Sequence, residues 1–258
     1  MHNDKPIGLF DSGIGGTSIW KEIRQLLPNE DTIYLADSSN APYGQRPKQE
    51  IIDLSKKNVE LLLEYDCKLI VVACNTATTN AIQELRTQYD VPFIGIEPAI
   101  KPAVLDSKTN SIGVLATKGT LSSELFSKAV ETYQNTKIVE QVGFNLVKLI
   151  ENGQMESEEM TRLLHQYLEP MIAADIDYLV LGCSHYPYLI PQIRKIVPPH
   201  VQIIDSGSAV ARQTQHLLKT IAGTASERIG DSTFFTNSDP TVLSQILGPD
   251  YKVTELVF

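Results

Sequence analysis

Two cysteines stand directly after runs of apolar residues, next to groups that can tune the protonation of a thiol. Cys74 ends the run LIVVAC and is followed by Asn75. Cys183 follows the run LVLG and is followed by Ser184 and His185. A free cysteine has a pKa of about 8.5, so a thiolate forms at neutral pH for roughly 2 kcal/mol, and a nearby imidazole or helix N-terminus reduces that cost. Both cysteines are therefore candidates for acid–base chemistry.

A pair of thiols on opposite sides of a ligand has a specific use. One thiolate removes a proton from a carbon centre and the other thiol returns a proton to the opposite face, which inverts the centre. A metal site or a redox disulfide is an alternative, but the sequence has neither a CxxC pair nor an HExxH motif. The third cysteine, Cys67 in EYDCKLI, is expected to be an apolar filler of the core.

Three further segments supply polar groups after apolar runs. DSGIGGTS offers Asp11, Ser12 and backbone N–H groups, but it lacks the third glycine of a dinucleotide fingerprint and the GK[ST] ending of a P-loop. NAPYG, at residues 40–44, has the composition of a turn that can close over a ligand. ATKGT adds the hydroxyls of Thr117 and Thr120.

These polar segments follow short, β-branched runs bounded by turn residues, which is the pattern of buried parallel strands. The predicted strands of the first half are IGLF (7–10), TIYLA (32–36), LIVVA (69–73) and FIGI (93–96). Helical spacing of apolar residues lies between them at 46–66 and 77–89. Strands that alternate with helices predict an α/β fold with a mainly parallel sheet.

The second half repeats this order at nearly constant spacing. Its four matching segments are IGVLATKG (112–119), TKIVEQV (136–142), LVLGCSH (179–185) and VQIIDSG (201–207). Cys74 and Cys183 occupy equivalent positions in the two halves. We therefore predict two similar, pseudo-symmetric α/β lobes, the first formed by residues 1–98 plus 208–258 and the second by residues 99–207.

The expected site is the cleft between the two lobes. Ligands of open parallel sheets bind beyond the carboxyl ends of the strands. Both cysteines fall at such ends, so lobes that face each other would present a thiol to the ligand from each side. The tail is expected to pack back onto the first lobe, with a helix at 209–221 and a final strand near 252–258.

The composition is that of an ordinary globular protein and argues against several kinds of partner. The formal charge of −9 disfavours a nucleic-acid surface, which needs clustered Lys and Arg. No apolar run approaches the roughly 20 residues of a membrane helix. The first residues, MHNDKPIGLFDSG, show no cationic region before an apolar one, so we expect no secretory signal and a cytoplasmic protein with free thiols.

Taken together and in order, the motifs resemble those of the glutamate racemases, in the cofactor-independent aspartate/glutamate racemase family, over essentially the whole chain. The motifs are DSGIGG (11–16), PYG (42–44), ACNTA (73–77), GIEPA (95–99) and GCSHYP (182–187). The resemblance implies interconversion of L- and D-glutamate by two cysteines, with no cofactor and no metal. It also implies that the D-glutamate supplies peptidoglycan synthesis.

The resemblance further implies roles for individual residues. Cys74 would act on D-glutamate, with Asp11 as a helper beside it. Cys183 would act on L-glutamate, helped by His185 and, less directly, by Glu151. The implied substrate contacts are Asp11, Ser12, Tyr43, Gly44, Asn75, Thr76, Ser184 and His185.

Two positions depart from the usual pattern of the family. Ser184 stands where threonine is usual, so the hydroxyl remains and a methyl group is lost. Gly143 and Phe144 stand where the family often has Cys-Pro ahead of its glutamate, which weakens the assignment of Glu151.

The sequence leaves two other functions open. A racemase of related fold that acts on aspartate would share the chemistry and differ in the length of its substrate. A non-catalytic amino-acid-binding or regulatory protein on the same scaffold would be favoured by the loss of a thiol, and both thiols are present. The expected partner is a small molecule rather than a nucleic acid or a membrane, and a homodimer is compatible with the sequence.

Overall fold

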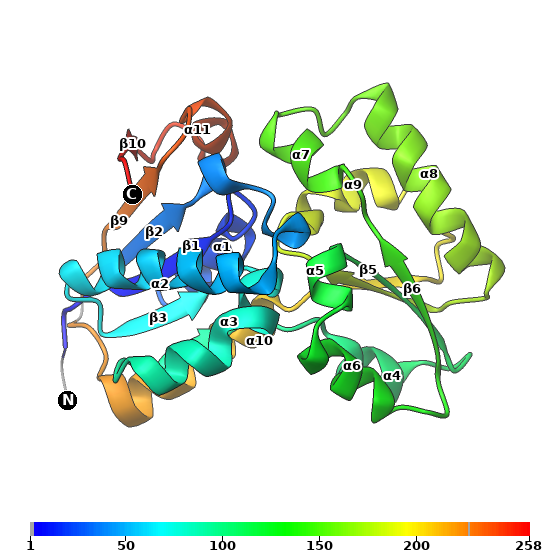
Figure 1. Ribbon diagram of the computed structural model, residues 1–258, viewed down its shortest axis with the longest axis horizontal. Helices are drawn as coiled ribbons and strands as arrows, with labels where there is room; N and C mark the ends of the chain where they lie inside the picture. Colours follow the sequence, from blue (N-terminus) through cyan, green and yellow to red (C-terminus); the bar gives the residue numbers. More distant parts are fainter. Residues whose placement is uncertain (1–2, 227) are drawn as a thin grey trace.

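The computed structural model describes residues 3–226 and 228–258, and the strands in this part form two parallel sheets (Figure 1). The strands of the first sheet are β1 (Ile7–Asp11), β2 (Thr32–Ala36), β3 (Leu69–Val72), β4 (Phe93–Gly95), β9 (Ser232–Thr236) and β10 (Val253–Glu255). Those of the second are β5 (Ser111–Ala116), β6 (Lys137–Val142), β7 (Tyr178–Gly182) and β8 (Gln202–Ile204). The two-lobed α/β class predicted from the sequence is confirmed.

The repeat seen in the sequence is also present in the topology. The first sheet has the order β10-β9-β2-β1-β3-β4 and the second has the order β6-β5-β7-β8. The first four strands of each half therefore share one arrangement, in which the opening strand lies between the second and the third. Ile7 pairs with both Thr32 and Leu69, and Ile112 likewise pairs with Ile138 and Tyr178.

Helices cover both sheets. In the first lobe they are α1 (Thr17–Leu26), α2 (Lys48–Glu64), α3 (Asn75–Gln88), α10 (Gly207–Leu217) and α11 (Thr241–Leu247). In the second they are α4 (Ile100–Asp106), α5 (Lys118–Leu121), α6 (Glu124–Glu131), α7 (Leu146–Glu151), α8 (Glu158–Ala173) and α9 (Ile190–Ile193). Short 3-10 turns are η1 (Ser38–Asn40), η2 (Tyr43–Gln45) and η3 (Tyr186–Leu189). In the view of Figure 1, α2 and α3 lie in front of the first sheet.

The predicted helices of the first half are confirmed with small shifts at their ends. Helix α3 begins at Asn75, slightly earlier than predicted, because the side chain of Cys74 accepts a hydrogen bond from the N–H of Ala77 and caps the helix. The helix predicted at 209–221 is α10, which ends at Leu217 and continues as a π-helical turn at 218–222.

The tail packs onto the first lobe, as predicted. Strand β9, which the sequence analysis missed, pairs with β2, and the shorter β10 pairs with β9. The indole of Trp20 on α1 meets the rings of Phe234 and Tyr251 from the tail at centroid distances of 4.8 and 5.0 Å. Aromatic burial therefore fixes the tail to the sheet. Within the described ranges, none of the helices is both long and apolar enough to cross a lipid bilayer.

A buried ion pair joins the loops at the amino end of the first sheet. The Nζ of Lys68, just before β3, lies 2.6 Å from Oε2 of Glu30, and both side chains are almost fully buried. The other carboxylate oxygen of Glu30 accepts a hydrogen bond of 2.8 Å from the N–H of Ala225, in the segment that leads to β9. Lys68 also donates to the carbonyl of Asn3. The pair thus ties four distant segments together, those of Asn3, Glu30, Lys68 and Ala225.

We expect Glu30→Gln to lower the free energy of unfolding by about 3 kcal/mol or more, because it leaves the buried ammonium group of Lys68 without its counter-charge. Urea unfolding followed by circular dichroism measures the change. The matched control is Asp66→Asn, which breaks the exposed Lys5–Asp66 pair at a position whose φ of 58° asparagine tolerates. The control should change stability by less than about 1 kcal/mol. Equal effects of the two variants would contradict the structural role of the buried pair.

Candidate active site

The two sheets present equivalent edges to each other. In each sheet the second strand lies on one side of the opening strand and the third strand lies on the other. The strand order therefore reverses between β1 and β3 in the first sheet and between β5 and β7 in the second. Open α/β sheets bind ligands at such a reversal. Asp11 ends β1 and Cys74 follows β3, while Thr117 and Cys183 follow β5 and β7. The two edges meet, because the hydroxyls of Thr76 and Thr117 are hydrogen-bonded at 2.8 Å.

A small pocket lies at this meeting point. Its lining residues are Ser12, Pro42, Tyr43, Gly44, Cys74, Asn75, Thr76, Thr117, Val147, Cys183, Ser184 and His185. The pocket lining contains both cysteines and every predicted substrate contact except Asp11, and the predicted helper Glu151 does not line it either. Pro42 belongs to the NAPYG turn that was expected to close over a ligand. Sequence analysis missed Val147, which carries no chemical group that would single it out. The free space has room for only about one water molecule, so the lobes are closed around it.

Cys74 is buried at the amino end of α3. Its sulfur accepts a hydrogen bond of 3.4 Å from the N–H of Ala77 and donates one of 3.6 Å to Oγ of Ser12. Burial raises the pKa of the Cys74 thiol well above its usual value, and the nearby Asp11 carboxylate raises it further, whereas the bonds to Ala77 and Ser12 act in the opposite direction. The Cys74 thiol is therefore protonated at neutral pH in this closed pocket.

Cys183 has a different neighbour, the imidazole of His185. Nδ1 of His185 lies 3.8 Å from the sulfur, and Nε2 lies 2.5 Å from Oε1 of Glu151. Burial alone would lower the pKa of His185, but hydrogen bonds to Cys183 and Glu151 and the charge of Asp11 raise it well above its usual value. A protonated His185 places a hydrogen-bond donor and a positive charge beside the Cys183 sulfur, which is the environment that stabilises a thiolate.

Asp11 lies next to Cys74 and His185 and does not line the pocket. Its side chain is fully buried, and it accepts hydrogen bonds from the N–H of Gly16 at 2.8 Å and from Oγ of Ser184 at 3.2 Å. Burial raises the pKa of Asp11, while His185, 3.9 Å away, and the Gly16 bond lower it. The carboxyl group of Asp11 is thus coupled electrostatically to Cys74 and to His185.

Asn75 has unused hydrogen-bonding capacity at the pocket. The side chain is 2% exposed, and neither Nδ2 nor Oδ1 has a hydrogen-bond partner among the described residues. A buried polar group without a partner costs about 1–3 kcal/mol, so its retention in a pocket points to a ligand that carries both a donor and an acceptor.

The structure brings Glu151 into the site despite the unusual residues before it. Its carboxylate accepts hydrogen bonds from the N–H of Ile14 at 2.7 Å and from Oγ of Ser38 at 2.9 Å, in addition to the contact with His185. The turn at Gly143 is held by the hydroxyl of Tyr186, which donates to the carbonyl of Gly143 at 3.1 Å. The departure from the family pattern therefore does not displace Glu151.

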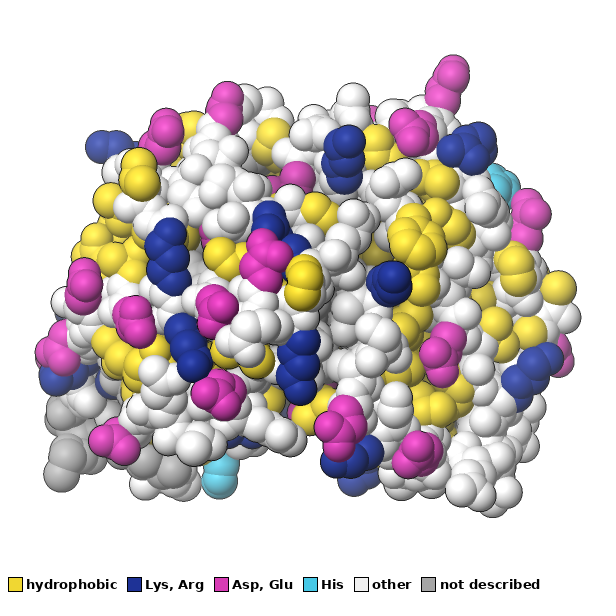
Figure 2. All heavy atoms as spheres, viewed as in Figure 1, with side chains coloured by type: hydrophobic (Ala, Val, Ile, Leu, Met, Phe, Trp, Pro, Cys, Tyr) yellow, Lys and Arg dark blue, Asp and Glu magenta, His cyan; other side chains and the backbone are white. Residues whose placement is uncertain are grey.

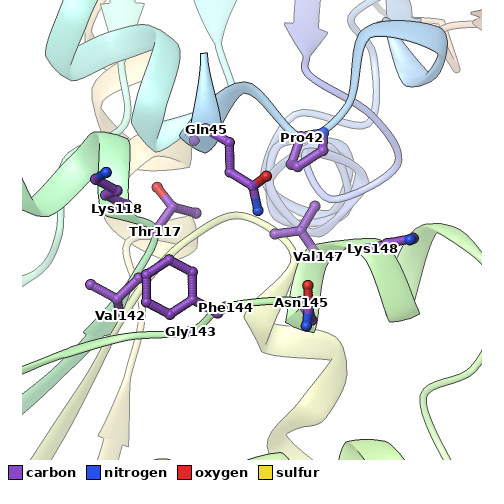
Figure 3. A pocket seen from close by; sticks show the side chains of 11 residues that line it. Pro42, Gln45, Thr117, Lys118, Val142, Gly143, Phe144, Asn145, Val147 and Lys148 are labelled. Atoms are coloured by element: carbon purple, nitrogen blue, oxygen red, sulfur yellow. The ribbon is translucent and has the colours of Figure 1, made fainter. Parts of the chain in front are cut away.

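A second pocket adjoins the first between the lobes, and its lining side chains are shown in Figure 3. It shares Pro42, Gly44, Thr117 and Val147 with the inner pocket. Its charged lining residues are two lysines, Lys118 and Lys148, both exposed. Figure 2 shows Lys and Arg side chains along this boundary between the lobes, with Asp and Glu side chains among them, so the two lysines provide only a local attraction for an anionic small molecule.

The fold and the site define a two-lobed α/β protein with a thiol on each side of one closed pocket. Comparison with known proteins agrees: the profile of the family described as Asp/Glu/Hydantoin racemase matches residues 7–214. The chain belongs to this family of racemases, which are isomerases. Across the described ranges, no group of three or more His, Cys, Asp and Glu side chains is placed to hold a metal ion.

Individual relatives are similar over most of their length. The glutamate racemase of Herpetosiphon aurantiacus is 47% identical over 216 residues, which cover 83% of this chain and 85% of that protein. A glutamate racemase isoform of Bacillus anthracis has a TM-score of 0.89 at 31% identity and covers 99% of this chain and 98% of its own. The Escherichia coli glutamate racemase, solved with L-glutamate and the activator UDP-MurNAc-Ala, has a TM-score of 0.87 at 31% identity, with 98% of both chains covered.

We expect Glu151→Gln to lower the pKa of His185, because the variant removes a charged acceptor from Nε2. A pKa raised above the usual value of 6.5 means that protonated His185 stabilises the fold below pH 6.5, and that this stabilisation is lost as the pH rises through the folded pKa. NMR titration of the imidazole nitrogens measures the shift. Glu169→Gln, which removes the acceptor of the exposed His165, is the control and should leave the His185 signals unchanged. An unchanged His185 titration in Glu151→Gln would contradict this electrostatic assignment.

Proposed function

We propose that this protein interconverts L- and D-glutamate by two-base proton transfer between Cys74 and Cys183. The observation that carries the proposal is the position of the two thiols, which follow equivalent strands of the two lobes and line the same closed pocket. The names of the relatives support glutamate as the substrate. The motifs that resemble those of the family also supply the residues of this pocket, with Ser184 in place of the usual threonine.

The two sulfurs alone account for both proton transfers in the proposed reaction. With L-glutamate bound, the Cys183 thiolate takes the α-proton, so a C–H bond breaks and an S–H bond forms. The Cys74 thiol then donates its proton to the opposite face of the carbanion and becomes the thiolate. The reverse reaction starts from D-glutamate and the Cys74 thiolate, with the roles exchanged.

The environments of the two sulfurs suit this direction of transfer. The raised pKa of Cys74 keeps it protonated and ready to donate, while His185 supplies a donor beside Cys183. Burial and the negative charge of Asp11 both raise the pKa of Cys74. When D-glutamate binds, its ammonium group beside Asp11 would offset that charge. Substrate binding would in this way help to ionise the thiol that must act first.

The polar lining supplies what glutamate requires. The unpaired amide of Asn75 and the hydroxyls of Ser12, Thr76 and Ser184 can bind the two carboxylates. Hydrogen-bond donors that are already fixed in a water-poor pocket stabilise the negative charge that develops during proton removal. The closed lobes provide that exclusion of water.

Two other functions differ from this proposal in substrate or in the absence of catalysis. An aspartate racemase would use the same thiols on a shorter dicarboxylate, and the high identity to glutamate racemases favours the longer one. A binding protein without catalysis would not need both sulfurs in one pocket. The proposed role is to supply D-glutamate for peptidoglycan in the cytoplasm, and a homodimer remains a prediction.

We expect purified protein to racemise glutamate in D₂O without added cofactor and to replace the α-hydrogen with deuterium. Cys74→Ala and Cys183→Ala should each lower the turnover by at least about 100-fold, because each removes one of the two bases. Circular dichroism follows chirality and proton NMR follows the α-hydrogen. Cys67→Ala is the matched control, since Cys67 packs against Gly8 in the core and burial raises its pKa to about 12, and it should retain activity. Turnover of aspartate alone would support the first alternative, and no turnover of either substrate would support the second.

We expect Ser184→Thr to retain the turnover of the unmodified protein within about threefold. Threonine keeps the hydroxyl that donates to Asp11 at 3.2 Å and restores the residue usual in the family. Steady-state kinetics with both enantiomers measure the effect, and Ser184→Ala, which lacks the hydroxyl, is the comparison. Inactivation by threonine would show that this pocket does not tolerate the extra methyl group.

A further inference from the structure

The carboxylate of Glu151 connects the two lobes at one side of the pocket. Glu151 ends α7 of the second lobe, where it contacts His185, and it accepts hydrogen bonds from two groups of the first lobe. These groups are the N–H of Ile14, at 2.7 Å, and Oγ of Ser38, at 2.9 Å. The side chain of Glu151 is only 13% exposed, so these bonds are shielded from water.

The closed pocket cannot admit a substrate as it stands. Its free space holds only about one water molecule, so an amino acid must enter when the lobes have moved apart. Separation of the lobes would break the bonds from Ile14 and Ser38 to Glu151. Opening of the lobes would therefore change the hydrogen bonds of the same carboxylate that contacts Nε2 of His185.

Within the described part of the chain, the hydroxyl of Ser38 forms no hydrogen bond inside its own turn. That turn is held by Asp37, which accepts hydrogen bonds from the side chains of Asn40, Tyr43 and Asn237. The bond from Oγ of Ser38 instead crosses to the other lobe. The next residue, Ser39, is exposed, and its side chain forms no hydrogen bond with any residue that the structure describes.

We propose that Ser38 and the N–H of Ile14 form an interlobe latch with Glu151. The latch favours the closed state and holds Glu151 against His185 when the pocket is shut. Ser38 is in this sense a positioning residue that acts on Cys183 through Glu151 and His185. The kinetic part of this proposal rests on the proposed racemase function, whereas the structural part does not.

The test compares Ser38→Ala with Ser39→Ala, a matched pair of neighbouring serines. Ser38→Ala should speed the exchange of the Ile14 amide hydrogen about fivefold to tenfold, measured by NMR in the substrate-free protein, because one of two interlobe bonds is lost. The KM for glutamate should rise by a similar factor while kcat changes less than about twofold, since saturating substrate restores closure. Ser38→Thr, which keeps the hydroxyl, should restore both values, and Ser39→Ala should match the unmodified protein.

Each outcome has a definite meaning. If Ser38→Ala exchanges Ile14 no faster than Ser39→Ala does, there is no latch. If exchange is faster but KM is unchanged, Ser38 is only structural and its positioning role is wrong. If the unmodified protein does not racemise glutamate, the proposed function fails, and amide exchange still decides whether the latch exists.

Discussion

The close approach of the two lobes at the loop after β1 is the constraint on which the site depends. A Cβ at Gly13 would lie 1.9 Å from Oε1 of Glu151, and one at Gly15 would lie 2.2 Å from Nδ1 of His185. A side chain at Gly13 would displace the Glu151 carboxylate and one at Gly15 would displace the His185 ring, because such contacts are far inside van der Waals distance. The glycines of DSGIGG therefore make room for the partners of Cys183 on the edge of the opposite sheet.

This approach gives two equivalent cysteines unequal surroundings. Cys74 faces Asp11, whose negative charge adds to burial and keeps the pKa of the thiol high. Cys183 instead faces His185, which hydrogen bonds and charge keep protonated against the cost of burial. The pseudo-symmetric fold supplies two similar strand ends. One acidic and one basic neighbour break that symmetry, so the two sulfurs lie in different electrostatic surroundings.

Local patterns were enough to predict the strands, the repeat and most of the pocket. Parallel strands are short apolar runs, and the polar residues that follow them converge at one edge whatever the details of packing. The contacts of Glu151, Ser38 and Val147 could not be predicted in the same way, since each depends on how one lobe docks on the other. Strand β9 was also missed, because its run STFFT is short and lies far along the chain from its partner β2.

The tail shows how a segment remote from the chemistry shapes the pocket. The family profile ends at residue 214, before β9, yet Asn237, just after β9, donates a 2.6 Å hydrogen bond to Oδ1 of Asp37. Asp37 in turn accepts from the hydroxyl of Tyr43, so the tail fixes the loop that carries Ser38, Tyr43 and Gly44. The second lobe has no such tail, and its sheet remains four-stranded. The tail thus adds two strands and the hydrogen bond to Asp37 on the first lobe's side of the pocket.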